Sequence, residues 1–398
     1  MLRFSTSAQN MRSSAIRELM SMATNPDMIS FAGGMPNNDL FPIPEMDEIY
    51  NSLSDDVKKA GFQYGPTPGY PPLLESLKEY LKNKGLPVED NELLITTGSL
   101  QAIYLVSKIM LDPGDTVITE YPAFIGAIAA FKSFRANLST VPIDDDGPDL
   151  QALAGLLDSE SPGAKMLYLT PYFHNPAGII YSEQRKKDLL ALMQGRDLVM
   201  IEDDPYGELY FNEADKPLTT PMKVTAPTSL PICYTSSFSK YIGPGLRLGW
   251  LLAPHEIIEK CNLAKQAVDA CSPTLTQVLA HEFLARGKMN DYLARMRPIY
   301  KHRAQLMLDA LDVHMPSGVT WTHPRGGFYI WVTLPEYLDS LDVLKESIDN
   351  GAVFVVGKTF DPLGQRNNCF RISFCTTPEE KIARGVEIVA RAVKSRLK

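Results

Sequence analysis

The segment around Lys240 carries the residue types of a reactive site. A strand-like stretch ends near Tyr234, and hydroxyl side chains, the lysine, a glycine-rich turn and Arg247 follow it. Hydroxyls, free backbone N–H groups and an arginine suit a phosphate. A lysine in the same pocket suits Schiff-base chemistry, because burial or a neighbouring cation lowers its pKa. The alternative is a surface loop with a solvated lysine.

Two nucleotide-binding motifs do not fit this segment. Its glycines are spaced Gly243-x-Gly245-x-x-x-Gly249, which differs from the dinucleotide fingerprint G-x-G-x-x-G. The chain also contains no G-x-x-x-x-G-K-[ST] loop. Both nucleotide sites are therefore disfavoured.

Three consecutive acids follow another apolar stretch. Glu202, Asp203 and Asp204 come directly after residues 198–201, with Tyr206 close behind. A carboxylate at the carboxyl end of a strand can hold a proton on a heterocyclic nitrogen. The alternative is that these acids only begin a loop.

Polar residues occur in two further strand contexts. Asn175 precedes Pro176 in a turn, where its amide can reach a ligand oxygen, although ordinary turn chemistry explains it equally well. His174 is better interpreted as structural, because no acid or serine lies near it in sequence. Arg371 lies within an apolar stretch and needs a partner if buried. Taken alone, it favours a carboxylate of the fold over a substrate carboxylate.

The elements that must position these residues alternate between strands and helices. Strand-like stretches lie at 93–96, 116–119, 166–169, 198–201, 232–234 and 250–252. Short, almost continuously apolar strands separated by helices are typical of an α/β fold, with a mostly parallel sheet covered on both faces. Ligands of such sheets bind at the carboxyl ends of the strands.

Two helices are marked by their patterns. The first carries leucines on one face and Gly85 as its C-terminal cap; these are Leu73, Leu74, Leu77 and Leu81. The second begins at Thr377-Pro378-Glu379-Glu380, which matches a capping box. Its apolar stripe, which we assign to the core, consists of Ile382, Val386, Val389 and Val393.

The pattern changes after about residue 286. Strand candidates 328–333, 353–356 and 370–374 lie among helices there, as in an α+β unit. We therefore expect an N-terminal arm and helix (1–45), a large domain (46–285) and a small C-terminal domain (286–398).

Composition limits the class of protein. The 398 residues are 44% hydrophobic and 22% charged, which excludes a disordered chain, a collagen-like chain and a disulfide-dense miniprotein. The net charge of −8 argues against a general nucleic-acid binder. Five cysteines without a C-x-x-C pair, and no secretory signal, indicate reduced thiols and a cytoplasmic protein. We expect no metal site.

No membrane span is expected. The longest apolar run, 124–131, has eight residues, and a span needs about 18 or more. The first 17 residues lack acids and faintly resemble a transit peptide. They are short for one, so we favour an arm followed by a helix from about Ser13.

The ordered set Asn175, Asp203, Lys240, Arg247 and Arg371 resembles the site of fold-type I pyridoxal-phosphate enzymes, the class I/II aminotransferases. The resemblance runs from about Ala15 to the C-terminus. It is closest to the branch that holds α-aminoadipate, kynurenine and related aromatic aminotransferases. Similarity to the signatures of that branch lies at 31–37, 40–42, 62–70 and 97–103.

The resemblance implies pyridoxal 5'-phosphate bound as a Schiff base to Lys240 in a large helix-covered domain with a smaller α+β C-terminal domain. The freed Lys240 amine would then move the substrate proton. Asp203 would pair with the ring nitrogen, and its spacing to Tyr206 in a D-x-x-Y arrangement favours it over its acidic neighbours. Tyr206 and Asn175 would hydrogen-bond the ring O3′.

The resemblance also implies the residues around the phosphate and the ring. The phosphate would be held by Ser99, Ser237, Ser239 and Arg247. Tyr64 would come from the neighbouring subunit of a homodimer, which makes the site a shared one. Phe124 would stack on the ring where this branch usually has tyrosine, and Leu100 stands where relatives often carry glutamine.

For the substrate, the resemblance implies that Arg371 clamps the α-carboxylate. Arg17 lies where relatives place an arginine for a second carboxylate; otherwise it is an exposed helix charge. Gly34 and Tyr329 would shape the rest of the pocket, and Asn175 would contact the substrate as well as the cofactor. The expected reaction moves the amino group of an aromatic, aminoadipate or branched-chain amino acid to 2-oxoglutarate.

Two alternatives remain. The same fold and cofactor support β-elimination, as in a C–S lyase. A transcription regulator with an aminotransferase-like domain would need about 60 residues ahead of the glycine motif at 32–34 for its helix-turn-helix, and only 31 precede it. A non-catalytic protein would also be expected to lack Lys240 or Asp203.

Overall fold

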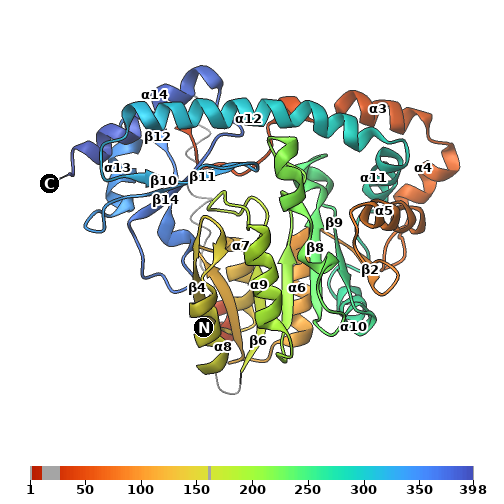
Figure 1. Cartoon of the computed structure of the whole chain (residues 1–398). Coiled ribbons are helices and arrows are strands. Elements are labelled where there is room, and N and C mark those ends of the chain that lie inside the picture. Colours follow the sequence, from red (N-terminus) through yellow and green to blue (C-terminus); the bar gives the residue numbers. More distant parts are fainter. Residues whose placement is uncertain (1, 11–26, 160–162, 398) are drawn as a thin grey trace.

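An eight-stranded sheet with helices on both faces forms the centre of the molecule (Figure 1). The computed structural model describes residues 2–10, 27–159 and 163–397. The strand order is β2 (Glu92–Thr96), β9 (Gly249–Ala253), β8 (Ile232–Ser237), β7 (Val199–Asp203), β6 (Ala164–Leu169), β3 (Thr116–Tyr121), β4 (Asn137–Asp144) and β5 (Gly147–Pro148).

The sheet is mostly parallel, which confirms the expected α/β class. Neighbouring strands from β8 to β4 are all parallel. Strand β9 runs antiparallel to β2 and β8, and β5 runs antiparallel to β4. All six apolar stretches became strands. Sequence analysis missed β4, in which Val141 is the only buried residue, because a strand near the sheet edge needs no continuous apolar run.

Alternation of side chains along each strand divides the core into two layers. On one face, Tyr168 and Ile201 pack in a cluster with α6 (Ser99–Met110), α7 (Ile125–Ser133) and α10 (His255–Gln266). On the other face, Leu167 and Tyr234 join a larger cluster. The helices that contribute to it include α5 (Pro71–Asn83), α8 (Leu150–Ser159), α9 (Glu183–Met193) and α11 (Thr274–Ala285).

Helix α5 illustrates how local signals set an element. Pro71 occupies the first turn, where its missing N–H costs nothing. Leu73, Leu77 and Leu81 are buried, whereas Leu74 lies at the edge of the buried face. The helix stops before Gly85, which has a φ of +85°, a conformation that favours glycine.

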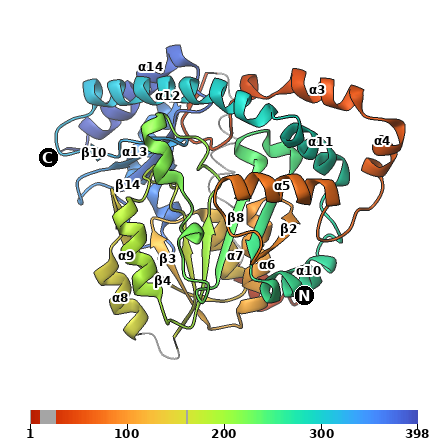
Figure 2. The same ribbon diagram turned by 45° about the vertical axis from the view of Figure 1, so that its right-hand side comes forward.

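The C-terminal part of the chain builds a second, smaller sheet. Its antiparallel order is β10 (Thr320–Trp321), β11 (Tyr329–Thr333), β14 (Cys369–Ser373) and β13 (Val355–Val356). Helix α12 (Lys288–His314) runs along the upper side of the molecule beside α14 (Glu379–Lys394), as Figures 1 and 2 show, and α13 (Ser340–Asp349) lies nearby. Residue 286, the expected boundary, lies in the turn between α11 and α12.

The remaining elements lie toward the N-terminus. Helices α3 (Ile43–Ser52) and α4 (Asp55–Phe62) lie beside α11, and α1 (Thr6–Asn10) contacts α7. Strand β1 (Ile29–Ser30) pairs in parallel with β12 (Ala352–Val353), so part of the expected N-terminal arm pairs with the C-terminal part of the chain. In the described ranges no helix is long and apolar enough to cross a membrane.

Two local predictions were wrong. The Thr377 hydroxyl donates to the carbonyl of Ser30 (2.7 Å), so it forms no capping box. Residues 353–356 do not form one strand, because β12 pairs with β1 while β13 pairs with β14. In both cases a partner from a distant part of the chain overrides the local pattern.

Candidate active site

Most predicted site residues line one cavity of about 310 Å³. It collects segments that follow β6, β7 and β8 together with the small sheet. The predicted residues on its wall are Gly34, Ser99, Leu100, Phe124, Asn175, Asp203, Tyr206, Ser237, Ser239, Lys240, Arg247, Tyr329 and Arg371. The sheet topology thus brings together side chains that are up to 337 positions apart in sequence.

Lys240 ends a short helical turn that follows β8. Its Nζ donates to the carbonyl of Gly34 (3.1 Å) and lies 5.7 Å from the centre of the Tyr206 ring. Burial lowers the pKa of Lys240 to about 8; the nearby Cys375 thiol opposes this shift, and the Arg371 cation adds to it. A lysine with this pKa holds a sizeable neutral fraction near neutrality, which a nucleophile or a base requires.

Hydroxyls and an arginine surround one end of the cavity. Ser99 is the first residue of α6, so backbone N–H groups of the helix N-terminus are available beside it. Ser237 donates to Ser239 (2.9 Å), and Arg247 donates to the carbonyl of Thr97 (3.1 Å). This group of donors suits an anion.

Close packing explains one glycine of the glycine-rich segment, Gly249. A Cβ on Gly249 would lie 2.7 Å from the Ser99 nitrogen and 2.7 Å from the Ser236 carbonyl oxygen. Real Cβ atoms do not approach other atoms so closely. Glycine therefore lets β9 approach the turn that begins α6, at the end of the cavity where Ser99 and Arg247 lie.

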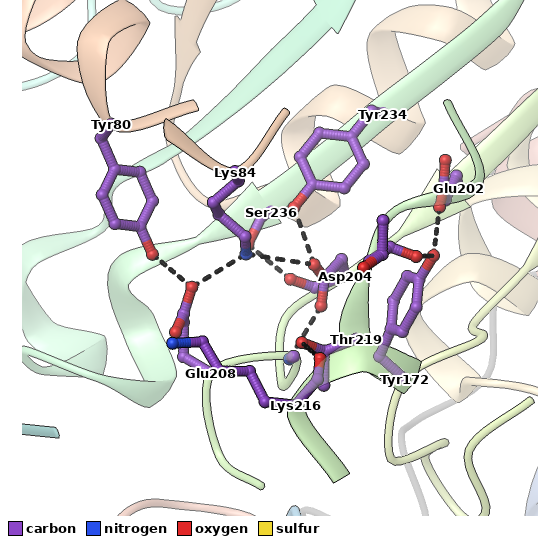
Figure 3. Close-up of polar contacts among 12 residues, drawn as sticks. Tyr80, Lys84, Tyr172, Glu202, Asp204, Glu208, Lys216, Thr219, Tyr234 and Ser236 are labelled. Atoms are coloured by element: carbon purple, nitrogen blue, oxygen red, sulfur yellow. Dashed lines mark hydrogen bonds and ion pairs between the residues drawn. The ribbon is translucent and has the colours of Figure 1, made fainter. Parts of the chain in front are cut away.

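The three acids at the end of β7, Glu202, Asp203 and Asp204, point alternately to the two faces of the sheet. Glu202 and Asp204 lie away from the cavity, in the polar network of Figure 3, and Asp203 alone lines it. Asp204 accepts hydrogen bonds from Tyr234 (2.7 Å) and from the Gly207 N–H (2.8 Å), and Lys84 lies 3.9 Å away. Burial raises the pKa of Asp204 to about 6, against the effects of Lys84 and Tyr234.

Asp203 lines the cavity, and its two carboxylate oxygens differ in their hydrogen bonding. Its Oδ2 accepts from Tyr168 (2.8 Å), whereas its Oδ1 is buried without a hydrogen-bond partner among the described residues. Burial raises the pKa of Asp203 to about 7, although the Tyr168 hydroxyl lowers it. An unpaired buried oxygen is costly, so the site favours a ligand with a proton donor.

Arg371 has no carboxylate partner among the residues that the structure describes, so the salt bridge that its sequence context favoured is absent. Its guanidinium donates to Asn175 Oδ1 (2.9 Å) and to the carbonyl of Ala32 (2.8 Å), and lies 4.3 Å from the centre of the Tyr329 ring. Nε remains buried without a partner in the described part of the chain. A paired donor fork beside a cavity suits a carboxylate.

Tyrosines and a glycine close the wall between Lys240 and Arg371. The hydroxyls of Tyr206 and Tyr329 lie 3.1 Å apart. A Cβ on Gly34 would overlap the Tyr329 hydroxyl, so this close approach requires glycine.

Three residues named in the sequence analysis are not among the described residues that line the cavity: Tyr64, Arg17 and His174. Tyr64 is 85% exposed and does not line the cavity of this chain. Arg17 lies outside the described residues. His174 is buried, accepts from the Ala177 N–H (3.1 Å) and has Glu120 3.4 Å from its Nε2. The fold thus supplies an acid that the neighbouring sequence lacks, although His174 does not line the cavity.

Sequence analysis missed two residues near Asp203. Thr170 lines the cavity, and Tyr168 contacts Asp203 from β6. The available signal was their alternate spacing at the end of an apolar stretch, which places both on one face once a strand is assumed. The identity of that face required the sheet order.

The fold and the site together define a pyridoxal-phosphate enzyme of the aminotransferase kind. Residues 35–389 match the family described as Aminotransferase class I and II, and the chain belongs to this family. It is a pyridoxal-phosphate-dependent transaminase, as its relatives indicate.

Three relatives illustrate the likeness. The Aromatic-amino-acid aminotransferase 1 of Thermococcus litoralis is 35% identical over 99% of this chain and 95% of its own. The kynurenine aminotransferase structure from Pyrococcus horikoshii has a TM-score of 0.95 and 36% identity, covering 99% of this chain and 98% of the other. The alpha-aminoadipate aminotransferase of Thermus thermophilus, solved with N-(5'-phosphopyridoxyl)-L-leucine, has a TM-score of 0.89 and 38% identity over 98% and 97%.

Proposed function

We propose that this transaminase moves the amino group of an aromatic, aminoadipate or branched-chain amino acid to 2-oxoglutarate, with its cofactor joined to Lys240 as a Schiff base. The observation that carries the proposal is the placement of Lys240, Arg371 and the unpaired Asp203 oxygen on one cavity. Names of relatives support the substrate class, since they include aromatic, kynurenine and α-aminoadipate aminotransferases.

The residues present fit pyridoxal 5'-phosphate. Ser99, Ser237, Ser239 and Arg247 would hold the phosphate, and Asp203 Oδ1 would meet the ring nitrogen. When bound, the cofactor supplies an electron sink for the substrate Cα. Phe124 and Leu100 would border the ring.

Lys240 would act as the proton carrier of the reaction. Its pKa of about 8 allows the amine to accept the Cα proton and to return it near neutral pH. Tyr206, whose ring lies beside the amine, and Asn175 would hydrogen-bond the ring hydroxyl. Arg371 would bind the α-carboxylate and orient the Cα–H bond.

The distal part of the substrate would meet Gly34, Tyr329 and Arg17. We propose that Arg17 pairs with the side-chain carboxylate of glutamate or 2-oxoglutarate. The test compares Arg17→Ala with the native enzyme: kcat/KM for dicarboxylic substrates should fall more than for aromatic ones. An equal fall for both would remove Arg17 from the pocket.

We also propose a homodimer in which Tyr64 reaches the phosphate of the partner subunit. The exposure of Tyr64, together with exposed Phe62 (74%), leaves an aromatic surface that a second copy could cover. Tyr64→Phe should weaken cofactor affinity, measured by titration of the apoenzyme. Sedimentation as a monomer at micromolar concentration would contradict the dimer.

The central experiment is a panel of amino donors with 2-oxoglutarate, assayed for glutamate. We expect glutamate formation with at least one of the three donor classes. Release of pyruvate and ammonia without glutamate would favour a lyase instead. A separate experiment tests the Schiff base. Borohydride reduction followed by peptide mapping should find the reduced cofactor attached to Lys240. The Lys240→Ala variant should bind the cofactor, but borohydride should not attach it covalently to the protein.

A further inference from the structure

Each of the three consecutive acids at the end of β7 has its own buried tyrosine. The donor–acceptor pairs are Tyr172 with Glu202 (2.5 Å), Tyr168 with Asp203 (2.8 Å) and Tyr234 with Asp204 (2.7 Å). Figure 3 shows the first and the third of these pairs, which lie away from the cavity. Only the middle tyrosine bonds to the acid that lines the cavity.

Strand register explains why Tyr168 reaches Asp203. Strands β6 and β7 are parallel, with Tyr168 opposite Ile201. Asp203 lies two residues beyond Ile201 and therefore on the same face. A tyrosine side chain is long enough to reach this diagonal neighbour. On the other side of β7, Tyr234 is opposite Glu202 and reaches Asp204 in the same way.

The direction of the Tyr168 hydroxyl is fixed by its surroundings. The Thr170 hydroxyl donates to the Tyr168 oxygen (3.2 Å), so the tyrosine proton points to Asp203. Thr170 is itself held by its N–H, which donates to Glu120 (2.7 Å). The Phe131 ring meets the Tyr168 ring edge-on at 5.6 Å. These side chains are almost fully buried, although Thr170 and Asp203 also line the cavity.

We propose that Tyr168 is a positioning residue for Asp203: it occupies Oδ2, leaves Oδ1 for the cofactor ring nitrogen and favours the ionised carboxylate. Tyr168 does not line the cavity, so it acts through Asp203 and touches neither substrate nor cofactor. The inference rests on the proposed role of Asp203.

The charges around Asp203 make its pKa depend on the hydrogen bond from Tyr168. Burial raises its pKa to about 7, and Asp204 and Glu120 act in the same direction. Tyr168 and Lys240 act in the opposite direction. Loss of the Tyr168 hydroxyl therefore makes Asp203 more basic, and a proton shared with a ring nitrogen would move toward the carboxylate.

The experiment measures the protonation of the ring nitrogen directly. The native enzyme and its variants are reconstituted with ¹⁵N-labelled pyridoxal 5'-phosphate, and the nitrogen resonance is recorded at one pH. In Tyr168→Phe it should move toward the position of the unprotonated free cofactor, and kcat should fall roughly tenfold. The matched control, Tyr234→Phe, removes an equivalent buried hydroxyl from Asp204 and should leave the resonance unchanged.

The outcomes separate this inference from the proposed function. A native-like resonance in Tyr168→Phe, or equal shifts in both tyrosine variants, would overturn the role of Tyr168. An unshifted resonance in Asp203→Asn would instead remove Asp203 as the nitrogen partner. If Tyr168→Phe does not fold, 3-fluorotyrosine at position 168, a stronger donor, should move the resonance in the protonated direction, and no movement would refute the proposal.

Discussion

The guanidinium of Arg371 donates to Asn175 Oδ1 at 2.9 Å, which joins the small sheet to the turn after β6. This contact orients both groups before a substrate arrives. No residue of the described ranges bonds to the Asn175 amide nitrogen, so it can donate to a ligand, while the arginine keeps donors for a carboxylate. Two residues that lie far apart in the sequence, both predicted to bind the substrate, are therefore one structural unit.

Removal of this arginine should weaken amino-acid binding. Arg371→Ala would delete the charge-assisted hydrogen bonds that we propose for the α-carboxylate, so kcat/KM for the amino donor should fall about 100-fold or more. Steady-state kinetics give the result. As control, the cofactor absorbance of the variant should match that of the native enzyme. A fall below about threefold would mean that another cation binds the carboxylate.

The pKa of Lys240 predicts an unusual reactivity of the apoenzyme. At pH 7 an amine with a pKa of about 8 is roughly 10% neutral, far more than an ordinary lysine. Competitive labelling with an amine-directed reagent, followed by peptide mapping, should show half-maximal reactivity of Lys240 near pH 8. Labelling of the exposed Lys59 in the same experiment provides the internal control. Equal profiles would contradict the assignment.

The two glycines at 33 and 34 should differ in their tolerance of a methyl group. A Cβ on Gly34 would overlap the Tyr329 hydroxyl, whereas a Cβ on Gly33 has its nearest contact, Thr376 Oγ1, at 3.5 Å. Gly34→Ala should therefore lower kcat/KM by about tenfold or more, and Gly33→Ala should have a smaller effect. Activity recovered in Gly34→Ala with Tyr329→Phe would confirm the overlap as the cause.

The network of Figure 3 predicts an acid-dependent stability. Although burial opposes it, Lys84 and Tyr80 lower the pKa of Glu208 to about 2. A carboxyl with a lowered folded-state pKa contributes stability above its unfolded pKa of about 4.3, and that stability is lost as the pH falls toward 2.

Glu208→Gln should therefore flatten the loss of stability between about pH 5 and 2, measured as the midpoint of thermal unfolding. Glu89→Gln, which removes a fully exposed carboxylate whose pKa Lys82 lowers, should flatten the slope less, because solvent screens this ion pair. An unchanged slope in Glu208→Gln would show that this carboxyl titrates normally.

Sequence alone determined the class of fold and most of the cavity wall. Lys240 with its hydroxyls, and the acids after an apolar stretch, are local patterns, because strands, turns and their end positions depend on neighbouring residues. The ordered motifs then supplied the family resemblance. Helix and strand positions followed from periodicity for the same reason, with errors where a distant partner intervened, as at Thr377.

Only the tertiary structure decided which side chains of the site contact one another. The sequence favoured a salt bridge for Arg371, and the fold instead placed it beside Asn175 and a cavity. No local pattern indicated that Tyr168 bonds to Asp203. Such contacts depend on the order and register of strands, which arise from packing of the whole core and leave no mark on any single stretch of residues.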